Sequence, residues 1–191
     1  MGKSTTREEI VEAGRQLFFR YGLKKVTVTE ICTGAGVSKM TFYKYFPNKQ
    51  ALAKTIMDGI TDYWLKRYWD VMRSDASFAE KMHRFVEMKM EGTRDPSSEF
   101  ILEMFRSDDP EISGYAENLY KRSISESVAM FTLAQEKGWM RRDLKPELLM
   151  ALLNGMFQVV MDEKVIALYD NLTELTSEVI KFFLYGISDE R

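Results

Sequence analysis

The chain has 191 residues, of which 45% are hydrophobic and 29% are charged, and its net charge is −2. This composition excludes a disordered chain and favours a globular protein with one domain, or with one domain and a small additional one. The single cysteine, Cys32, excludes an intramolecular disulfide, and no secretory leader is recognised, so we expect a cytoplasmic protein. The most apolar stretch, residues 148–161, is too short to span a bilayer, and no membrane partner is expected.

Charge is unevenly distributed along the chain. Residues 1–54 carry a net charge of +6, whereas residues 55–191 carry −8. A basic segment joined to an acidic remainder is typical of proteins whose basic part binds a polyanion such as DNA. A run of charge is more often only a solvated surface, so this pattern alone indicates nucleic-acid binding weakly.

Two helices are predicted before the first glycine-rich turn. Apolar residues recur at helical spacing over residues 10–21, and Gly22 stands where such a helix would end. Thr27, followed three residues later by Glu30, has the pattern of a capping box and begins the second helix. Glycines at positions 34 and 36 predict that this second helix is short.

A third short helix is predicted directly after the glycine turn. Ser38 is placed to cap its start, and Pro47 closes it. Two short helices joined by a tight glycine turn form a helix-turn-helix. We therefore expect residues 1–48 to form a three-helix DNA-binding domain.

The remainder of the chain is predicted to be helical. Loop signals made of Gly, Pro, Asp and Ser separate its helices. The predicted helices span residues 48–72, 77–91, 98–106, 114–136, 146–168 and 172–186. The fold class is therefore all-α with about nine helices, in which a larger helical domain at residues 49–191 follows the helix-turn-helix domain.

Side chains of the third helix suit contact with DNA. In a helix-turn-helix the N-terminal end of this helix leads into the major groove. Lys39 can donate to guanine, and Met40 and Thr41 can contact a thymine methyl group. Backbone N–H groups at the helix starts near Thr27 and Ser38 can bind phosphates.

The segment TVTEICTGAGVSKMTFYKYFPNKQAL, residues 27–52, resembles the helix-turn-helix of the tetracycline-repressor (TetR) family of bacterial transcriptional regulators. Several positions agree in register at once, and the preceding helix, IVEAGRQLFFRYG, fits the same pattern. Met40 departs from the family pattern because many members have a small residue there. Cys32 replaces the usual Ala, and we expect it to pack in the core rather than to sense redox state.

The resemblance implies a DNA-binding function and a set of contacts carried over position by position. The implied DNA contacts are Thr27, Thr29, Ser38, Lys39, Met40, Thr41, Tyr43, Lys44, Tyr45 and Lys49. The resemblance also implies that residues 49–191 dimerise and bind a small-molecule effector.

We expect a largely apolar effector, because the helical domain is rich in Met and aromatic residues. Candidate residues for lining its pocket are Trp64, Tyr68, Phe85, Met88, Met104, Phe105, Tyr120 and Phe131. Three polar side chains, Glu103, Ser123 and Ser127, could orient the effector. Each apolar side chain taken alone is more often part of the core than of a cavity.

A homodimer is expected because one recognition helix reads only a few base pairs, whereas two copies read a palindromic operator. The last two long helices are apolar over much of their surface and could form a four-helix interface. The candidate interface residues are Leu152, Gly155, Val159, Leu175, Val179, Phe182 and Phe183. The alternative is that these residues are the core of a monomer.

No enzyme is expected. His83 is the one histidine, and with Glu87 it would give only two metal ligands, so neither a metal nor another cofactor is predicted. The GAGVS segment follows no strand and is not a dinucleotide-binding loop.

The sequence therefore predicts a sequence-specific DNA-binding transcriptional regulator, with double-stranded DNA, a second copy of the chain and a small-molecule effector as partners. A repressor that an effector releases from its operator is the favoured form. The alternatives are an activator, a regulator controlled by a protein partner, and a helical ligand-binding protein whose DNA module is not functional.

Overall fold

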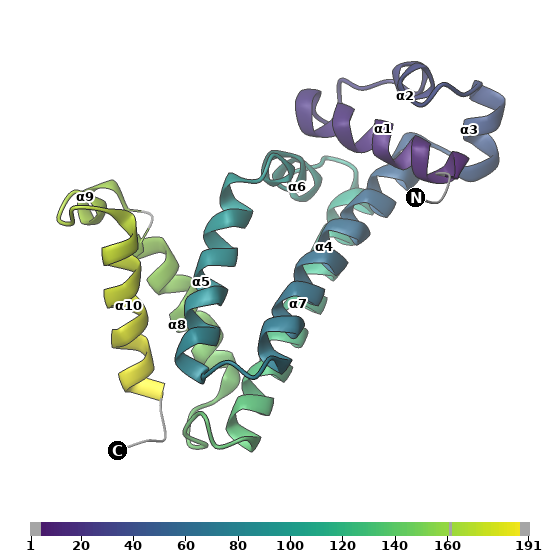
Figure 1. Cartoon of the computed structure of the whole chain (residues 1–191). Coiled ribbons are helices and arrows are strands. Elements are labelled where there is room, and N and C mark those ends of the chain that lie inside the picture. The colour runs from purple at the N-terminus through teal and green to yellow at the C-terminus, as the bar shows by residue number, and fades with distance from the viewer. Residues whose placement is uncertain (1–4, 161, 188–191) are drawn as a thin grey trace. The chain divides into compact units, whose positions relative to one another are not determined.

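The computed structural model describes residues 5–160 and 162–187, and within them it contains ten α-helices and no strand (Figure 1). This confirms the predicted all-α class. The helices are α1 (Thr6–Tyr21), α2 (Val28–Ala35), α3 (Lys39–Tyr45), α4 (Lys49–Arg73), α5 (Phe78–Arg94), α6 (Ser97–Phe105), α7 (Pro110–Glu136), α8 (Pro146–Val160), α9 (Glu163–Ile166) and α10 (Leu172–Ile187).

The helices form two compact units. The first unit holds the described residues up to Trp64 together with Gly92–Lys121, and the second holds Leu65–Glu91 and the described residues from Arg122 onward. Helices α4, α5 and α7 therefore contribute residues to both units. The predicted domain boundary at residue 48 differs from this division, because the first compact unit contains α1–α3 together with α6 and parts of α4, α5 and α7. The boundary between the two functions stays a prediction.

Local capping interactions begin α2 and α3 where the sequence predicts. Thr27 and Glu30 form the expected capping box at the start of α2, with each side chain bonded to the other residue's backbone N–H. The Ser38 hydroxyl accepts from the backbone N–H of Thr41 and caps α3. Gly36 ends α2 with φ +66°, a left-handed conformation that favours glycine.

The core of the first unit closes α1, α2 and α3 over the start of α4. Ile10, Ile31, Phe42 and Leu52 are fully buried in it. A Cβ added at Gly14 would lie 2.6 Å from Cδ2 of Leu52, so the absent side chain lets α1 approach α4 closely.

Cys32 is buried in this core, and burial raises the pKa of its thiol. A raised pKa keeps the thiol protonated and unreactive. This agrees with the expected packing role.

The core of the second unit contains Met72, Phe131, Leu149 and Phe183. Helices α8 and α10 pack against each other in this unit (Figure 1). Lys81 is also buried, at 1% exposure. Its Nζ donates to the carbonyl of Ser74 at 2.7 Å and lies 4.2 Å from the centroid of the Trp139 ring. Lys81 thus binds the residue that follows α4, and its ammonium group lies over the face of the Trp139 ring.

The prediction of one helix over residues 146–168 was wrong. Helix α8 ends at Val160, and the four-residue helix α9 begins after Asp162. The Asp162 carboxylate accepts from the backbone N–H of Lys164 at 2.8 Å and caps this new start. None of the helices in the described part of the chain combines the length and the apolar content that a membrane span needs.

Candidate nucleic-acid interface and effector cavity

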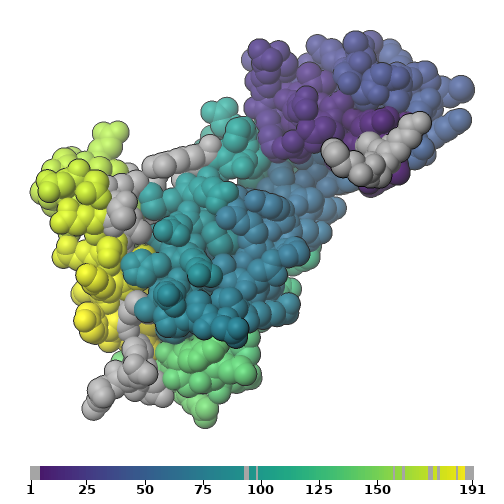
Figure 2. All heavy atoms as spheres, viewed as in Figure 1, coloured from purple at the N-terminus to yellow at the C-terminus, as the bar shows by residue number. Residues whose placement is uncertain are grey.

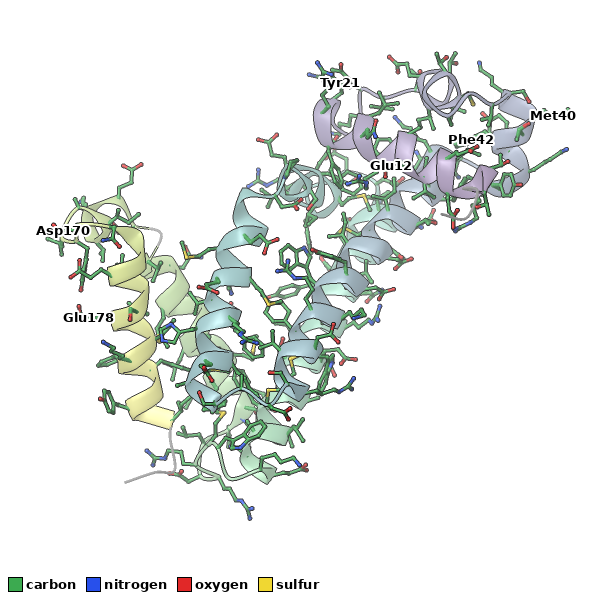
Figure 3. All side chains as sticks on the ribbon, in the orientation of Figure 1. Glu12, Tyr21, Met40, Phe42, Asp170 and Glu178 are labelled. Atoms are coloured by element: carbon green, nitrogen blue, oxygen red, sulfur yellow. The ribbon has the colours of Figure 1, made fainter. Side chains whose placement is uncertain are left out.

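Helix α3 divides its side chains between the core and the solvent. Phe42 and Phe46 are buried, whereas Met40, Tyr43 and Tyr45 are 71%, 53% and 45% exposed. Figure 3 shows Met40 projecting outward from α3 while Phe42 points back toward α1. The two buried rings fix the orientation of the helix, so the exposed side chains form one rigid surface.

Lysines add positive charge to this surface. Lys39 begins α3 and Lys44 lies in its last turn, and both are exposed. Exposed ammonium groups beside phenolic hydroxyls can bind phosphates, and the leading Lys39 and Met40 can reach base edges.

The hydroxyl groups predicted to contact DNA have a first role in helix capping. Ser38 Oγ lies 2.9 Å from Thr41 Oγ1 in addition to its bond with the Thr41 N–H. Thr27 Oγ1 donates to Glu30 at 2.7 Å. Thr27, Thr29 and Ser38 are exposed and Thr41 is half-buried. The caps place the helix N-termini, whose N–H groups are the natural phosphate ligands.

Lys49 is directed toward the protein rather than toward the α3 surface. Its Nζ donates to the carbonyl oxygens of Leu23, Lys24 and Val26, at 2.7, 3.2 and 2.8 Å. Burial lowers the pKa of this lysine, and the charge of Glu103 opposes that shift. The geometry gives Lys49 the task of holding the loop between α1 and α2, and its phosphate contact stays a prediction that this arrangement does not favour.

The second unit contains a partly open cavity of about 170 Å³. Its walls come from α4, α5, α7, α8 and α10 and are mostly Met, Phe, Val, Ile and Leu side chains. Three of the predicted effector contacts, Tyr68, Phe85 and Phe131, line it. Tyr68 and Phe85 pack edge to face with ring centroids 5.3 Å apart, and burial raises the pKa of Tyr68 to about 12, so its hydroxyl stays protonated.

The other five predicted effector contacts do not line this cavity. Met88 is buried in the second unit, away from the cavity wall. The remaining four belong to the first unit: Trp64, Met104, Phe105 and Tyr120. Met104 is a fully buried core residue there, and Phe105 packs edge to face against Tyr120. Their role as effector contacts stays a prediction that this arrangement does not favour, because helical spacing does not separate a core side chain from a cavity side chain.

Polar side chains of α5, α7 and α8 also line the cavity. Lys89 on α5 donates through Nζ to Oδ1 of Asn154 on α8 at 2.6 Å, and both side chains line the cavity. Ser127 also lines it, as predicted for an orienting group, and donates to the carbonyl of Ser123. Glu103 instead lies in the first unit. Neither Lys89 nor Asn154 was singled out from the sequence, where each is an ordinary polar residue within a helix.

Comparison with known proteins bears directly on the DNA-binding surface. Residues 10–56 match the family model described as bacterial regulatory proteins, tetR family. The matched segment contains α2 and α3 entirely, most of α1 and the start of α4.

Residues 10–56 carry the helix-turn-helix of the TetR family.

Proteins similar in sequence to this chain include transcriptional regulators. The HTH-type transcriptional repressor KstR2 of Mycobacterium tuberculosis is 24% identical over 148 residues, which are 76% of this chain and 74% of the relative. Similarity therefore extends beyond the helix-turn-helix into the helices that follow.

Solved structures share the fold over nearly the whole chain. The fatty acid degradation regulator FadR from Bacillus halodurans is 20% identical with a TM-score of 0.72, covering 97% of this chain and 98% of that one. FadR from Bacillus subtilis in complex with stearoyl-CoA is 18% identical with a TM-score of 0.69, covering 94% and 98%. At these identities the likeness concerns the fold.

The residues predicted for a dimer interface divide between exposed and inward-facing positions. Leu152, Val159 and Phe182 are 48%, 47% and 77% exposed, and Gly155 is exposed as well. The other three face inward: Leu175 and Phe183 are buried, and Val179 lines the cavity with Phe183.

Two further apolar side chains extend the exposed set on α8 and α10. Leu148 is 50% exposed and Tyr185 is 88% exposed. Figure 2 shows α10 (yellow) at the surface of the second unit. We call the exposed residues Leu148, Leu152, Val159, Phe182 and Tyr185 the α8–α10 face.

Among the described residues, no three His, Cys, Asp or Glu side chains gather as a metal site would require.

Proposed function

We propose that this TetR-family protein is a transcriptional repressor that binds a palindromic operator as a homodimer and leaves it when a largely apolar effector fills the cavity of the second unit. The observation that carries this proposal is the division of α3, in which buried Phe42 and Phe46 hold the helix while Lys39, Met40 and Tyr43 are exposed. Its place of action would be the cytoplasm, where the DNA lies.

The α3 surface supplies both kinds of contact that sequence-specific binding needs. Tyr43, Lys44 and Tyr45 would bind phosphates and set the register on the duplex. Lys39 and Met40, at the leading end, would meet base edges in the major groove. Met40 is long and apolar, so we expect it to favour a thymine methyl group over a polar base edge.

The α8–α10 face supports the homodimer. Its large apolar side chains are exposed to solvent in the single chain, and exposed apolar patches are typical of protein interfaces. A two-fold interface uses the same face of each subunit, and the resulting dimer would present two α3 helices about 34–36 Å apart to successive major-groove segments.

The cavity supports control by an effector. The Bacillus subtilis FadR structure holds stearoyl-CoA, which concerns that protein. For this chain, a cavity with apolar walls and few polar groups has the character of a small-molecule site.

Helix α4 is the proposed coupling element, because it contributes residues to both units and its Tyr68 lines the cavity. An effector that binds the DNA-free form about 100-fold more tightly would shift operator affinity by about 2.7 kcal/mol per coupled site.

Fluorescence anisotropy with duplexes from the region upstream of the protein's own gene tests the proposal. We expect tight binding to a palindromic duplex, weak binding to a scrambled one, and a steep loss of affinity with salt. Tyr43→Ala should weaken specific binding at least tenfold. Tyr63→Ala is the matched control, because Tyr63 is also 53% exposed but lies on α4. Equal, weak binding to both duplexes would contradict the proposal.

A further inference from the structure

The cavity of the second unit has few polar groups in a mostly apolar wall. Of the described residues that line it, twelve are apolar, and the polar ones are Tyr68, Lys89, Ser127 and Asn154. A few polar groups in an apolar wall fix the orientation of a bound molecule and select among molecules of similar size. The class of ligand therefore depends on which of these four groups can still form a hydrogen bond.

The Tyr68 hydroxyl is a free donor in this wall. Its ring packs edge to face against Phe85, but among the described residues no group forms a hydrogen bond with its Oη atom. Every fully buried side-chain nitrogen and oxygen in the described part of the chain has a partner, so this oxygen keeps some accessible surface. Burial also raises the pKa of Tyr68 to about 12, which places the hydroxyl away from bulk water. The hydroxyl therefore faces the cavity that Tyr68 lines.

Asn154 supplies a second donor on the cavity wall. Its Oδ1 accepts from Lys89 Nζ at 2.6 Å, which fixes the orientation of the amide group. The Nδ2 group of Asn154 then remains, and an amide N–H₂ group only donates. By contrast, the Ser127 hydroxyl already donates to the carbonyl of Ser123 at 2.9 Å. The hydrogen-bonding capacity left in the wall is therefore mainly that of donors, which a ligand meets with an acceptor such as a carbonyl oxygen.

The cavity wall disfavours a charged ligand. Lys89 is the one charged residue among the described lining residues, and it already has partners, including Oδ1 of Asn154. These lining residues include no acidic side chain, so a cation would find no opposite charge among them. An ionised group that leaves water costs far more free energy than a carbonyl that receives a hydrogen bond. The described lining therefore favours an uncharged ligand.

Cavity size limits the apolar part of such a ligand. An apolar cavity of about 150 Å³ holds one benzene molecule. The volume here is about 170 Å³, and its walls include Phe85, Phe131 and several Met side chains that adapt to irregular shapes. The space therefore suits an apolar body of about one aromatic ring.

We propose that the effector is an uncharged molecule with an apolar body of about one ring and a carbonyl oxygen that accepts a hydrogen bond from the Tyr68 hydroxyl. This inference rests on the proposed function, since it names the class of molecule that the repressor would sense. The apolar walls supply most of the binding free energy, and Tyr68 recognises the carbonyl group. A hydrocarbon of the same shape gains nothing from Tyr68, because it has no acceptor.

Methionine methyl groups report binding at this site. Met82, Met130, Met150 and Met156 line the cavity, whereas Met40 is 71% exposed on α3. The full-length protein, isotopically labelled in these methyl groups, is titrated without DNA and followed by NMR. The probes are acetophenone, isopropylbenzene and benzoate, which share one ring and a branched substituent but differ in polarity and charge. We expect acetophenone to shift the cavity methionines saturably and not Met40, and benzoate to bind at least tenfold more weakly.

Tyr68→Phe isolates the hydrogen bond, because it removes the hydroxyl and keeps the ring. It should weaken acetophenone binding about 3- to 10-fold and should not weaken isopropylbenzene binding. Comparing the two probes in both proteins cancels the difference in their own hydration. Tyr63→Phe is the matched control and should change neither affinity, because Tyr63 lies on the same helix but in the first unit, where it is 53% exposed.

Three outcomes would overturn the inference. The first is an equal effect of Tyr68→Phe on acetophenone and isopropylbenzene, including no effect on either. The second is binding of benzoate as tight as that of acetophenone. The third is the absence of any shift of the cavity methionines with acetophenone. Circular dichroism confirms that each variant is folded.

Operator binding, measured separately, distinguishes this inference from the proposed function. If the wild-type protein binds the palindromic duplex but Tyr68→Phe affects both probes equally, the carbonyl inference fails and the repressor stands. If acetophenone binds through Tyr68 while no duplex is bound specifically, the proposed function fails and the carbonyl site stands.

Discussion

Glu103 on α6 binds the backbone of Leu23, eighty residues earlier in the chain: its carboxylate accepts from the Leu23 N–H at 2.5 Å and from the Lys24 N–H at 2.8 Å. The carbonyl oxygens of the same loop accept from Lys49 on α4. In the loop that leads into α2, the Glu103 carboxylate therefore binds backbone N–H groups, and the Lys49 ammonium binds backbone carbonyl oxygens. Stacking of Phe18 on Phe100, at 5.6 Å between ring centroids, joins α1 to α6 beside it.

Glu103→Ala should destabilise the protein by about 1.5–3 kcal/mol, because two backbone N–H groups lose a charged acceptor. Chemical denaturation followed by circular dichroism measures this free energy of unfolding. Glu99→Ala, at an exposed position on the same helix, is the control and should change stability by less than about 0.5 kcal/mol. Equal effects of the two substitutions would show that the Glu103 bonds contribute nothing.

Lys49→Met should lower the free energy of unfolding by about 1–3 kcal/mol, because the loop carbonyls lose a charged donor. Its effect on the salt dependence of DNA binding should be small, since the Lys49 ammonium points into the protein. Lys44→Met should instead leave stability unchanged and reduce the slope of log affinity against log salt by about one. A reduced slope for Lys49→Met, measured well below the melting temperature, would restore the predicted phosphate contact.

Lys81→Met should destabilise the second unit by about 1–3 kcal/mol, although Met fills a similar volume. The Ser74 carbonyl would lose its charged donor, and the Trp139 ring would lose the ammonium on its face. Urea denaturation provides the measurement, with Lys137→Met at an exposed position as the control. A stabilised Lys81→Met variant would mean that the cost of burying the charge exceeds the value of these contacts.

Stability should rise with pH as Lys89 loses its proton. Burial lowers the pKa of Lys89 in the folded protein below its ordinary value of 10.5, so between these two pKa values the unfolded chain binds more protons. The free energy of unfolding then increases with pH in that window, whereas below it the buried charge is a constant cost. Lys89→Met should remove this increase. Parallel unfolding curves of the two proteins from pH 7 to 10.5 would contradict the prediction.

Phe182→Ser should weaken the homodimer at least tenfold, because it removes an exposed aromatic ring of the α8–α10 face from the proposed interface. Analytical ultracentrifugation over a range of concentrations measures the monomer–dimer equilibrium. Leu168→Ser is a close control, since Leu168 is also 77% exposed but lies just after α9, outside that face. A wild-type protein that stays monomeric at all concentrations would contradict the proposal that a homodimer binds a palindromic operator.

The sequence by itself determined the features that depend on residues three or four positions apart. The capping box of Thr27 with Glu30, the cap at Ser38 and the end of α2 at Gly36 all lie where their local patterns predict. Helical periodicity likewise identified the all-α class, and the register of the motif identified the exposed side of α3. These features are readable because both partners of each interaction are near neighbours in one helix or turn.

Only the tertiary structure decided the interactions between distant segments. Lys49 belongs to a recognised motif, yet its carbonyl partners lie 23 to 26 residues earlier. Lys89 meets Asn154 across 65 residues, and Glu103 meets Leu23 across 80. Periodicity states that a helix has an apolar face but not which helix covers it, so the cavity wall and the α8–α10 face emerge only when the helices pack.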